Sequence, residues 1–150
     1  MRVVLQRVSE ASVCIDKILR AQIEQGLLIL LGVSPTDTQE DIDWLCKKIC
    51  SLRIFSDSFG KKNHSVVDIE GDVLLISQFT LFANTKKGNR PSYINSASPE
   101  IAAPLYDKFI KSLEFQLQKT VYTGVFGADM QVSLINDGPV TIQLDSKNRV

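Results

Sequence analysis

The sequence predicts an α/β fold with mixed, largely antiparallel sheets and two main helices. Runs rich in Val, Ile and Leu, bounded by turn residues, recur along the 150-residue chain and predict about eight strands. Only two segments show the spacing of apolar residues that is typical of a helix. The strands come partly in succession, without strict alternation with helices, which favours a mixed sheet over a doubly wound parallel one.

The first strands are predicted close to the start of the sequence. Residues 1–9 and 11–16 are rich in Val and Ile with partial alternation, and residues 18–24 form a weaker third strand. Residues 27–33 are almost wholly apolar, so this strand is predicted to be buried on both faces.

The first helix is predicted to begin at Thr36 or Asp37, either of which could cap it, and to end near Ser51. A polar loop with a turn at Gly60 follows over residues 57–64. The apolar positions that support this helix are Ile42, Leu45, Cys46, Ile49 and Leu52.

The second helix is predicted to begin near Pro99, with Ser98 as its cap, and to end near Gln118. A loop over residues 84–98 precedes it. The remaining strands are predicted at residues 73–82, 121–125, 130–135 and 140–144.

Composition indicates a globular protein with one domain, residues 1–150. Hydrophobic residues make up 44% of the chain, and 17 basic residues balance 17 acidic ones. A zero net charge does not indicate a nucleic-acid-binding protein, but a local basic patch could still serve that purpose.

The cysteines and the single histidine do not form a metal-binding pattern. Cys46 and Cys50 share a helix face, but Cys14 and His64 have no ligand spacing to them, so neither a metal nor a cofactor is predicted. We expect reduced thiols in a cytoplasmic protein. No signal peptide is predicted, and the longest apolar run, residues 27–33, is too short for a membrane span.

Two polar stretches interrupt or follow apolar runs. Residues 77–80 lie inside one such run, and residues 136–141 follow another. A polar group at the end of a buried strand needs a hydrogen-bonding partner, and a rigid strand end is a plausible ligand site. Alternatively, the side chains bond locally and Gly138-Pro139 is only a turn; the residues alone leave both interpretations open.

Familiar catalytic motifs are missing. The chain contains no Gly-x-Ser-x-Gly elbow, phosphate-binding loop or dinucleotide glycine pattern, and no pair of carboxylates stands out by spacing. If the chain is an enzyme, backbone donors, positioning and a substrate group would have to support catalysis.

Seven segments stand out by their joint order and spacing: residues 1–8, 26–33, 52–55, 77–81, 87–92, 124–130 and 136–141. Taken together, they resemble the D-aminoacyl-tRNA deacylase family over the whole chain. Tyr93 stands where Phe is frequent in that family.

The resemblance implies the deacylase fold and a cytoplasmic homodimer that binds D-aminoacyl-tRNA and no membrane. The implied activity is hydrolysis of the ester bond, which releases the D-amino acid and the tRNA and so proofreads chirality in translation. Mischarged glycyl-tRNA is expected to be a further substrate. The rival functions are a non-catalytic RNA- or ligand-binding module and an esterase for another aminoacylated acceptor.

The resemblance also implies the catalytic residues Ser77, Gln78, Phe79 and Thr80. In a regular strand Ser77 and Phe79 would share one face, and Gln78 and Thr80 the other, so Phe79 is expected to act through its backbone N–H as an oxyanion donor. The 2′-hydroxyl of the terminal ribose is expected to assist hydrolysis.

Substrate binding is assigned by the resemblance to the dipeptide Gly138-Pro139, whose peptide bond is expected to be cis. It is expected to enter the partner subunit's site, accept hydrogen bonds from the substrate ammonium and exclude L side chains. Arg7 is expected to brace this loop, or else to form a surface ion pair. Met130 is expected to form the floor of the pocket, or else to be an ordinary core residue.

Contacts with tRNA are expected from the cationic segment that follows the first polar motif. Its members are Lys86, Lys87 and Arg90. Lysine and arginine side chains contact phosphate groups without reading the base sequence. The alternative is a solvated loop.

Overall fold

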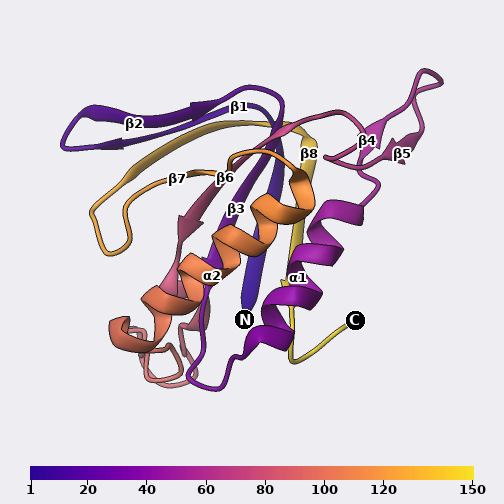
Figure 1. Ribbon diagram of the computed structural model, residues 1–150. Coiled ribbons are helices and arrows are strands. Elements are labelled where there is room, and N and C mark those ends of the chain that lie inside the picture. Colours follow the sequence, from indigo (N-terminus) through magenta and orange to yellow (C-terminus); the bar gives the residue numbers. More distant parts are fainter.

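A computed structural model describes residues 1–150, with two helices packed on one face of a mixed sheet (Figure 1). The helices are α1 (Gln39–Ser51) and α2 (Pro99–Leu117), and a 3₁₀ helix, η1, covers Phe79–Phe82. The strands of the main sheet are β1 (Arg2–Ile15), β2 (Ile18–Ile23), β3 (Gly26–Gly32), β6 (Asp72–Ser77), β7 (Tyr122–Thr123) and β8 (Gln131–Asp145).

The predicted mixed α/β class with two helices is confirmed. The strand order is β2-β1-β3-β6-β7, and β8 pairs with the other edge of β1. β1 pairs antiparallel with β2, β3 and β8, whereas β6 pairs parallel with β3 and β7. β6 therefore lies between two parallel neighbours, and its carboxyl end is Ser77.

Two pairs of predicted strands are single long strands. β1 is continuous because its first half pairs with β3 and its second half with β2. β8 likewise continues through Gly138-Pro139, where its register against β1 shifts. Gln6 lies opposite Thr141 and Val8 lies opposite Asn136, so residues 137–140 bulge out of the ladder.

Helix α1 begins later than predicted. Thr38 is its N-cap, and its N–H donates to the Asp41 carboxylate at 2.8 Å, so the predicted caps Thr36 and Asp37 are wrong. Asp37 is used elsewhere, because its carboxylate accepts a hydrogen bond from the buried α-ammonium of Met1 at 2.5 Å.

Other differences lie in the shorter elements. The predicted loop at residues 57–64 includes part of a hairpin of β4 (Phe55–Ser56) and β5 (Lys62–His64). The predicted strand at residues 73–82 ends at Ser77, and β7 is shorter than expected.

The sheet has apolar side chains on both faces. The larger cluster includes Leu45, Ile49, Phe109 and Leu113 of the helices. The smaller cluster, on the opposite face, is built from strand residues alone. Neither helix combines the length and the apolar character needed to cross a membrane.

Candidate functional site

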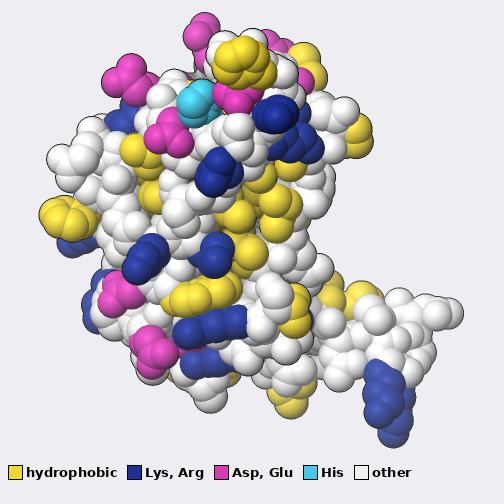
Figure 2. Space-filling view, turned by 90° about the vertical axis from the view of Figure 1, so that its right-hand side faces the viewer, with side chains coloured by type: hydrophobic (Ala, Val, Ile, Leu, Met, Phe, Trp, Pro, Cys, Tyr) yellow, Lys and Arg dark blue, Asp and Glu magenta, His cyan; other side chains and the backbone are white.

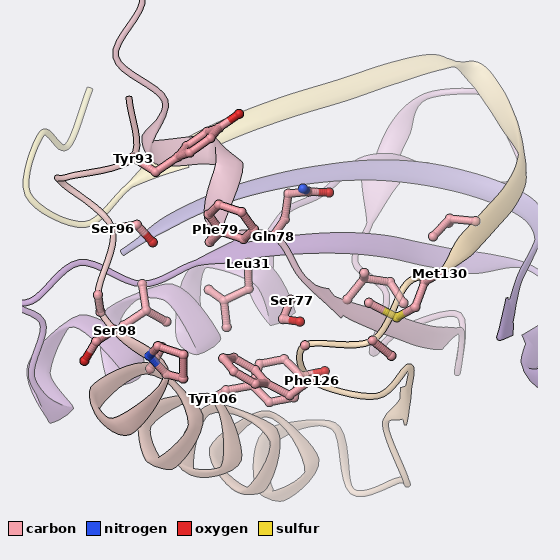
Figure 3. Close-up of a pocket in the computed structure, with 18 residues that line it drawn as sticks. Leu31, Ser77, Gln78, Phe79, Tyr93, Ser96, Ser98, Tyr106, Phe126 and Met130 are labelled. Carbon is pink, nitrogen blue, oxygen red and sulfur yellow. The ribbon is translucent and has the colours of Figure 1, made fainter. Parts of the chain in front are cut away.

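A pocket of about 580 Å³ lies at the carboxyl end of β6. Figure 3 shows Phe79 and Tyr93 on one side of it and Tyr106 and Phe126 on the other, with Ser77 between them. Twelve of its 18 lining residues are hydrophobic, which is typical of a small-molecule site with a few polar groups. The structure therefore places the first polar motif at a pocket.

The chain turns sharply at the end of β6. Gln78 has φ −144° and ψ 81°, and η1 begins at the next residue. The Gln78 N–H donates to Leu31 O at 2.8 Å, and its side-chain Nε2 donates to Thr80 Oγ1 at 2.5 Å. The expectation that side chains alternate through Thr80 is wrong because the strand ends at Ser77. Ser77, Gln78 and Phe79 line the pocket, and Thr80 does not.

Phe79 offers an unused backbone donor at the pocket. It is the first residue of η1, so its N–H has no partner within that helix, and no loop bond uses it. Its side chain is 55% exposed and contacts the Tyr93 ring edge-to-face, with centroids 5.0 Å apart. This N–H is therefore free to donate to a ligand that comes within reach of it.

Tyr106 of α2 forms part of the opposite wall. Its hydroxyl donates to Leu75 O at 3.1 Å, two residues before Ser77, and its ring lies 5.7 Å from the Phe126 ring. Burial, aided by Asp107, raises the pKa of Tyr106 to about 12, so the hydroxyl stays a donor. Sequence analysis missed this residue because its spacing matches that of ordinary core positions.

Met130 lies at one end of the pocket, next to the loop that follows β7 (Figure 3). A Cβ at Gly124 would lie 2.3 Å from Met130 Sδ, so only glycine leaves room for the sulfur in this position. Met130 also packs against the smaller apolar cluster. It is thus both a pocket residue and a packing residue.

Gly138 and Pro139 lie in the exposed bulge of β8 and do not line this pocket within one chain. Their peptide bond is cis, and Gly138 has φ +151°. Asn136 closes the bulge: its Oδ1 accepts the Val140 N–H at 2.7 Å, and its Nδ2 donates to Thr141 Oγ1 at 2.9 Å. This side chain replaces ladder bonds that the bulge removes.

Arg7 lies behind the bulge and is only 8% exposed. Its Nε donates to Asp137 O at 2.7 Å, and its Nη1 donates to Ile54 O. The guanidinium therefore ties the bulge to the connection between α1 and β4. This arrangement differs from a solvated surface ion pair, although the Asp137 carboxylate also lies 3.8 Å away.

The predicted cations lie in the segment after η1. Lys86, Lys87 and Arg90 are all exposed, and Lys86 lines a groove. Figure 2 shows Lys and Arg side chains across the middle and lower part of one face, with Asp and Glu side chains beside several of them. Further Lys or Arg side chains lie on a projecting arm of the same view, away from acidic side chains.

Comparison with known proteins gives consistent matches. Residues 4–145 match the family described as D-Tyr-tRNA(Tyr) deacylase. The D-aminoacyl-tRNA deacylases of Bacteroides fragilis and Flavobacterium psychrophilum are 60% and 61% identical over 149 residues, 99% of each chain.

Solved structures are similar as well. A structure of a c-Myc DNA unwinding element binding protein is 39% identical, with a TM-score of 0.92 over 97% of this chain and 98% of that one. A probable eukaryotic D-amino acid tRNA deacylase is 16% identical, with a TM-score of 0.82 over 95% and 97% of the two chains, and shows the fold alone.

Proposed function

The chain belongs to the D-Tyr-tRNA(Tyr) deacylase family, and from that premise we propose how its pocket hydrolyses the ester of D-aminoacyl-tRNA. The enzyme is a hydrolase, as its sequence resemblance implied. The observation that supports the proposal most directly is the unused Phe79 N–H beside Ser77 and Gln78 in an apolar pocket.

Catalysis in this proposal depends on a backbone donor and on the substrate. The Phe79 N–H stabilises the negative charge that develops on the carbonyl oxygen when water attacks the ester. No histidine or carboxylate lines the pocket, so the 2′-hydroxyl of the terminal ribose assists the attack. The products are a free D-amino acid and tRNA.

Chiral selection is assigned to the Gly138-Pro139 bulge of a second subunit. The bulge is exposed and is held by Arg7 and Asn136, which suits a rigid element that enters a partner's pocket. Its carbonyl groups would accept hydrogen bonds from the substrate ammonium, and its backbone would leave no room for an L side chain. Glycyl-tRNA would be accepted because glycine has no side chain to exclude.

The proposed contacts with tRNA come from the exposed cations Lys86, Lys87 and Arg90. They are close in sequence to the pocket residues and would bind phosphate groups without reading the base sequence. Because the chain has no net charge, such binding would be modest. An enzyme of this kind would act in the cytoplasm, where tRNA is charged.

We expect purified protein to hydrolyse D-Tyr-tRNA and to spare L-Tyr-tRNA. The physical reason is steric: the proposed backbone wall meets the side chain of only one enantiomer. The measurement is release of labelled tyrosine from each ester, with glycyl-tRNA as a third substrate. Equal turnover of the two enantiomers would contradict the proposed wall. Binding of tRNA without any turnover would instead favour the RNA-binding module.

Replacing Ser77 or Thr80 by alanine is expected to reduce kcat/KM by less than about tenfold, the loss of one ordinary hydrogen bond. No base in the pocket could activate either hydroxyl as a nucleophile. Thr80 contacts Gln78 and does not line the pocket. Steady-state kinetics on D-Tyr-tRNA test this expectation, and trapping an aminoacyl ester on either hydroxyl by mass spectrometry would overturn it.

A further inference from the structure

A second hollow, about 740 Å³ in volume, lies between the β3–α1 connection and the segment after η1. Both segments lie at the lower end of the molecule in Figure 1. We call this hollow the lower groove. Only three of its 11 lining residues are hydrophobic, in contrast to the pocket at Ser77. Its polar lining residues are Arg2, Ser34, Thr36, Asn84, Thr85, Lys86 and Asn95.

Two cationic side chains and no acidic side chain line the lower groove, and Asp145 pairs with one of the cations from behind. The cations are Arg2 and Lys86, and the other polar members are hydroxyls and amides. The Arg2 guanidinium is held in place: its Nε donates to Asp145 at 2.9 Å, its Nη1 donates to Leu81 O at 3.0 Å, and its Cζ lies 4.6 Å from the centre of the Phe82 ring. Cations, hydroxyls and amides are the side chains that contact phosphate oxygens.

Two segments of the chain separate the lower groove from the catalytic pocket, and each segment lines both. One wall is η1, since Phe79 lines the pocket and Phe82 lines the groove. The other is the segment before α2, in which Asn95 lines the groove and Ser96 lines the pocket. Extended backbone pairing between Asn84 and Ser92 joins the two segments, with N···O distances of 2.7 and 3.0 Å. The two hollows therefore lie on opposite sides of the same two segments.

We propose that the lower groove binds the phosphodiester backbone of the tRNA's unpaired 3′ end while its aminoacyl ester occupies the pocket. This inference rests on the function proposed above. With the aminoacyl ester of the terminal adenosine in the pocket, the phosphodiesters that join this adenosine to the rest of the tRNA extend beyond the pocket. The groove is the adjoining surface that combines one fixed cation, Arg2, one exposed cation, Lys86, and neutral donors. In a protein of zero net charge, such local cations supply the attraction for phosphate groups.

The test adds one carboxylate to each wall of the lower groove, in the variants Asn95→Asp and Thr36→Asp, both at exposed positions. Asn95→Ala and Thr36→Ala are the matched neutral controls. Each enzyme is assayed with D-Tyr-tRNA and with D-tyrosyl-adenosine, the same ester without phosphate. Thermal unfolding verifies that all variants are folded.

We expect each carboxylate to raise KM for D-Tyr-tRNA by roughly three- to tenfold and to leave kcat and the turnover of D-tyrosyl-adenosine unchanged. For D-Tyr-tRNA, log(kcat/KM) should fall as log salt rises, and the variant Lys86→Ala should reduce the steepness of this fall by about one. The same variant should not change the salt dependence for D-tyrosyl-adenosine. Lys111→Ala is the charge control: it removes an exposed lysine of α2 and should leave the salt dependence unchanged.

Two outcomes would overturn the inference. Equal losses on both substrates would place the effect in the pocket. Unchanged KM for D-Tyr-tRNA in both aspartate variants would show that no phosphate backbone lies there. If inorganic phosphate still bound the wild type in that case, the groove would be assigned to a free anion. Absence of wild-type turnover on either ester would instead reject the proposed function itself.

Discussion

Replacing Phe79 by proline is expected to lower kcat for D-Tyr-tRNA by about 10²–10³-fold, the usual loss for one oxyanion donor. Proline removes the backbone N–H that the proposed mechanism directs at the carbonyl oxygen. The loss should appear in kcat and in kcat/KM alike, because this hydrogen bond strengthens only as the oxyanion forms. Single-turnover rates on D-Tyr-tRNA provide the measurement.

The structure explains why this substitution is compatible with folding. The Phe79 N–H has no partner to lose, and proline suits the first position of a helix. Gln78 has φ −144° and ψ 81°, outside the α region that a following proline disfavours. Phe79→Ala is the matched control: it removes the ring that contacts Tyr93 but keeps the N–H, and should retain most activity. Equal losses in the two variants would reject the backbone donor.

Much of the fold could be predicted from the sequence because burial imposes periodicity. The spacing of Leu45 and Ile49 predicted α1, and the apolar run at residues 27–33 corresponds to β3. The ends of the elements were harder to predict. Several neighbouring Thr and Asp residues could cap α1, and only the contact of Thr38 with a carboxylate decides among them. Continuity of β1 and β8 depends on long-range pairing, which local pattern does not encode.

The site was harder to predict than the fold. Motif resemblance identified Ser77, Gln78 and Phe79, but not the turn into η1 that leaves the Phe79 N–H unused. Tyr106 has the spacing of a core residue. Its additional place in the pocket wall depends on a contact with Leu75 O, which the sequence does not show. The hydrogen bonds by which Asn136 closes the bulge form only once the bulge exists, so no local sequence pattern could indicate them.

Mixing two inactive variants is expected to restore activity if each site uses both subunits. Gly138→Ala is the partner of Phe79→Pro in this experiment. Gly138 has φ +151°, and an added Cβ would lie 2.9 Å from the Val140 side chain and 3.1 Å from Arg7 Nη2. The bulge must therefore shift, and we expect the homodimer of this variant to be inactive.

The arithmetic of a symmetric dimer makes the test decisive. In an equal mixture with free exchange, about half of the dimers are mixed, and each has one site with both lesions and one with neither. About a quarter of all sites should then be active. The matched control places both lesions on one chain and mixes it with wild type, which should also leave about a quarter of sites active, all in wild-type dimers. If each site belonged to one chain, the first mixture would stay inactive and the control would keep about half of its activity, because every wild-type chain would carry an intact site.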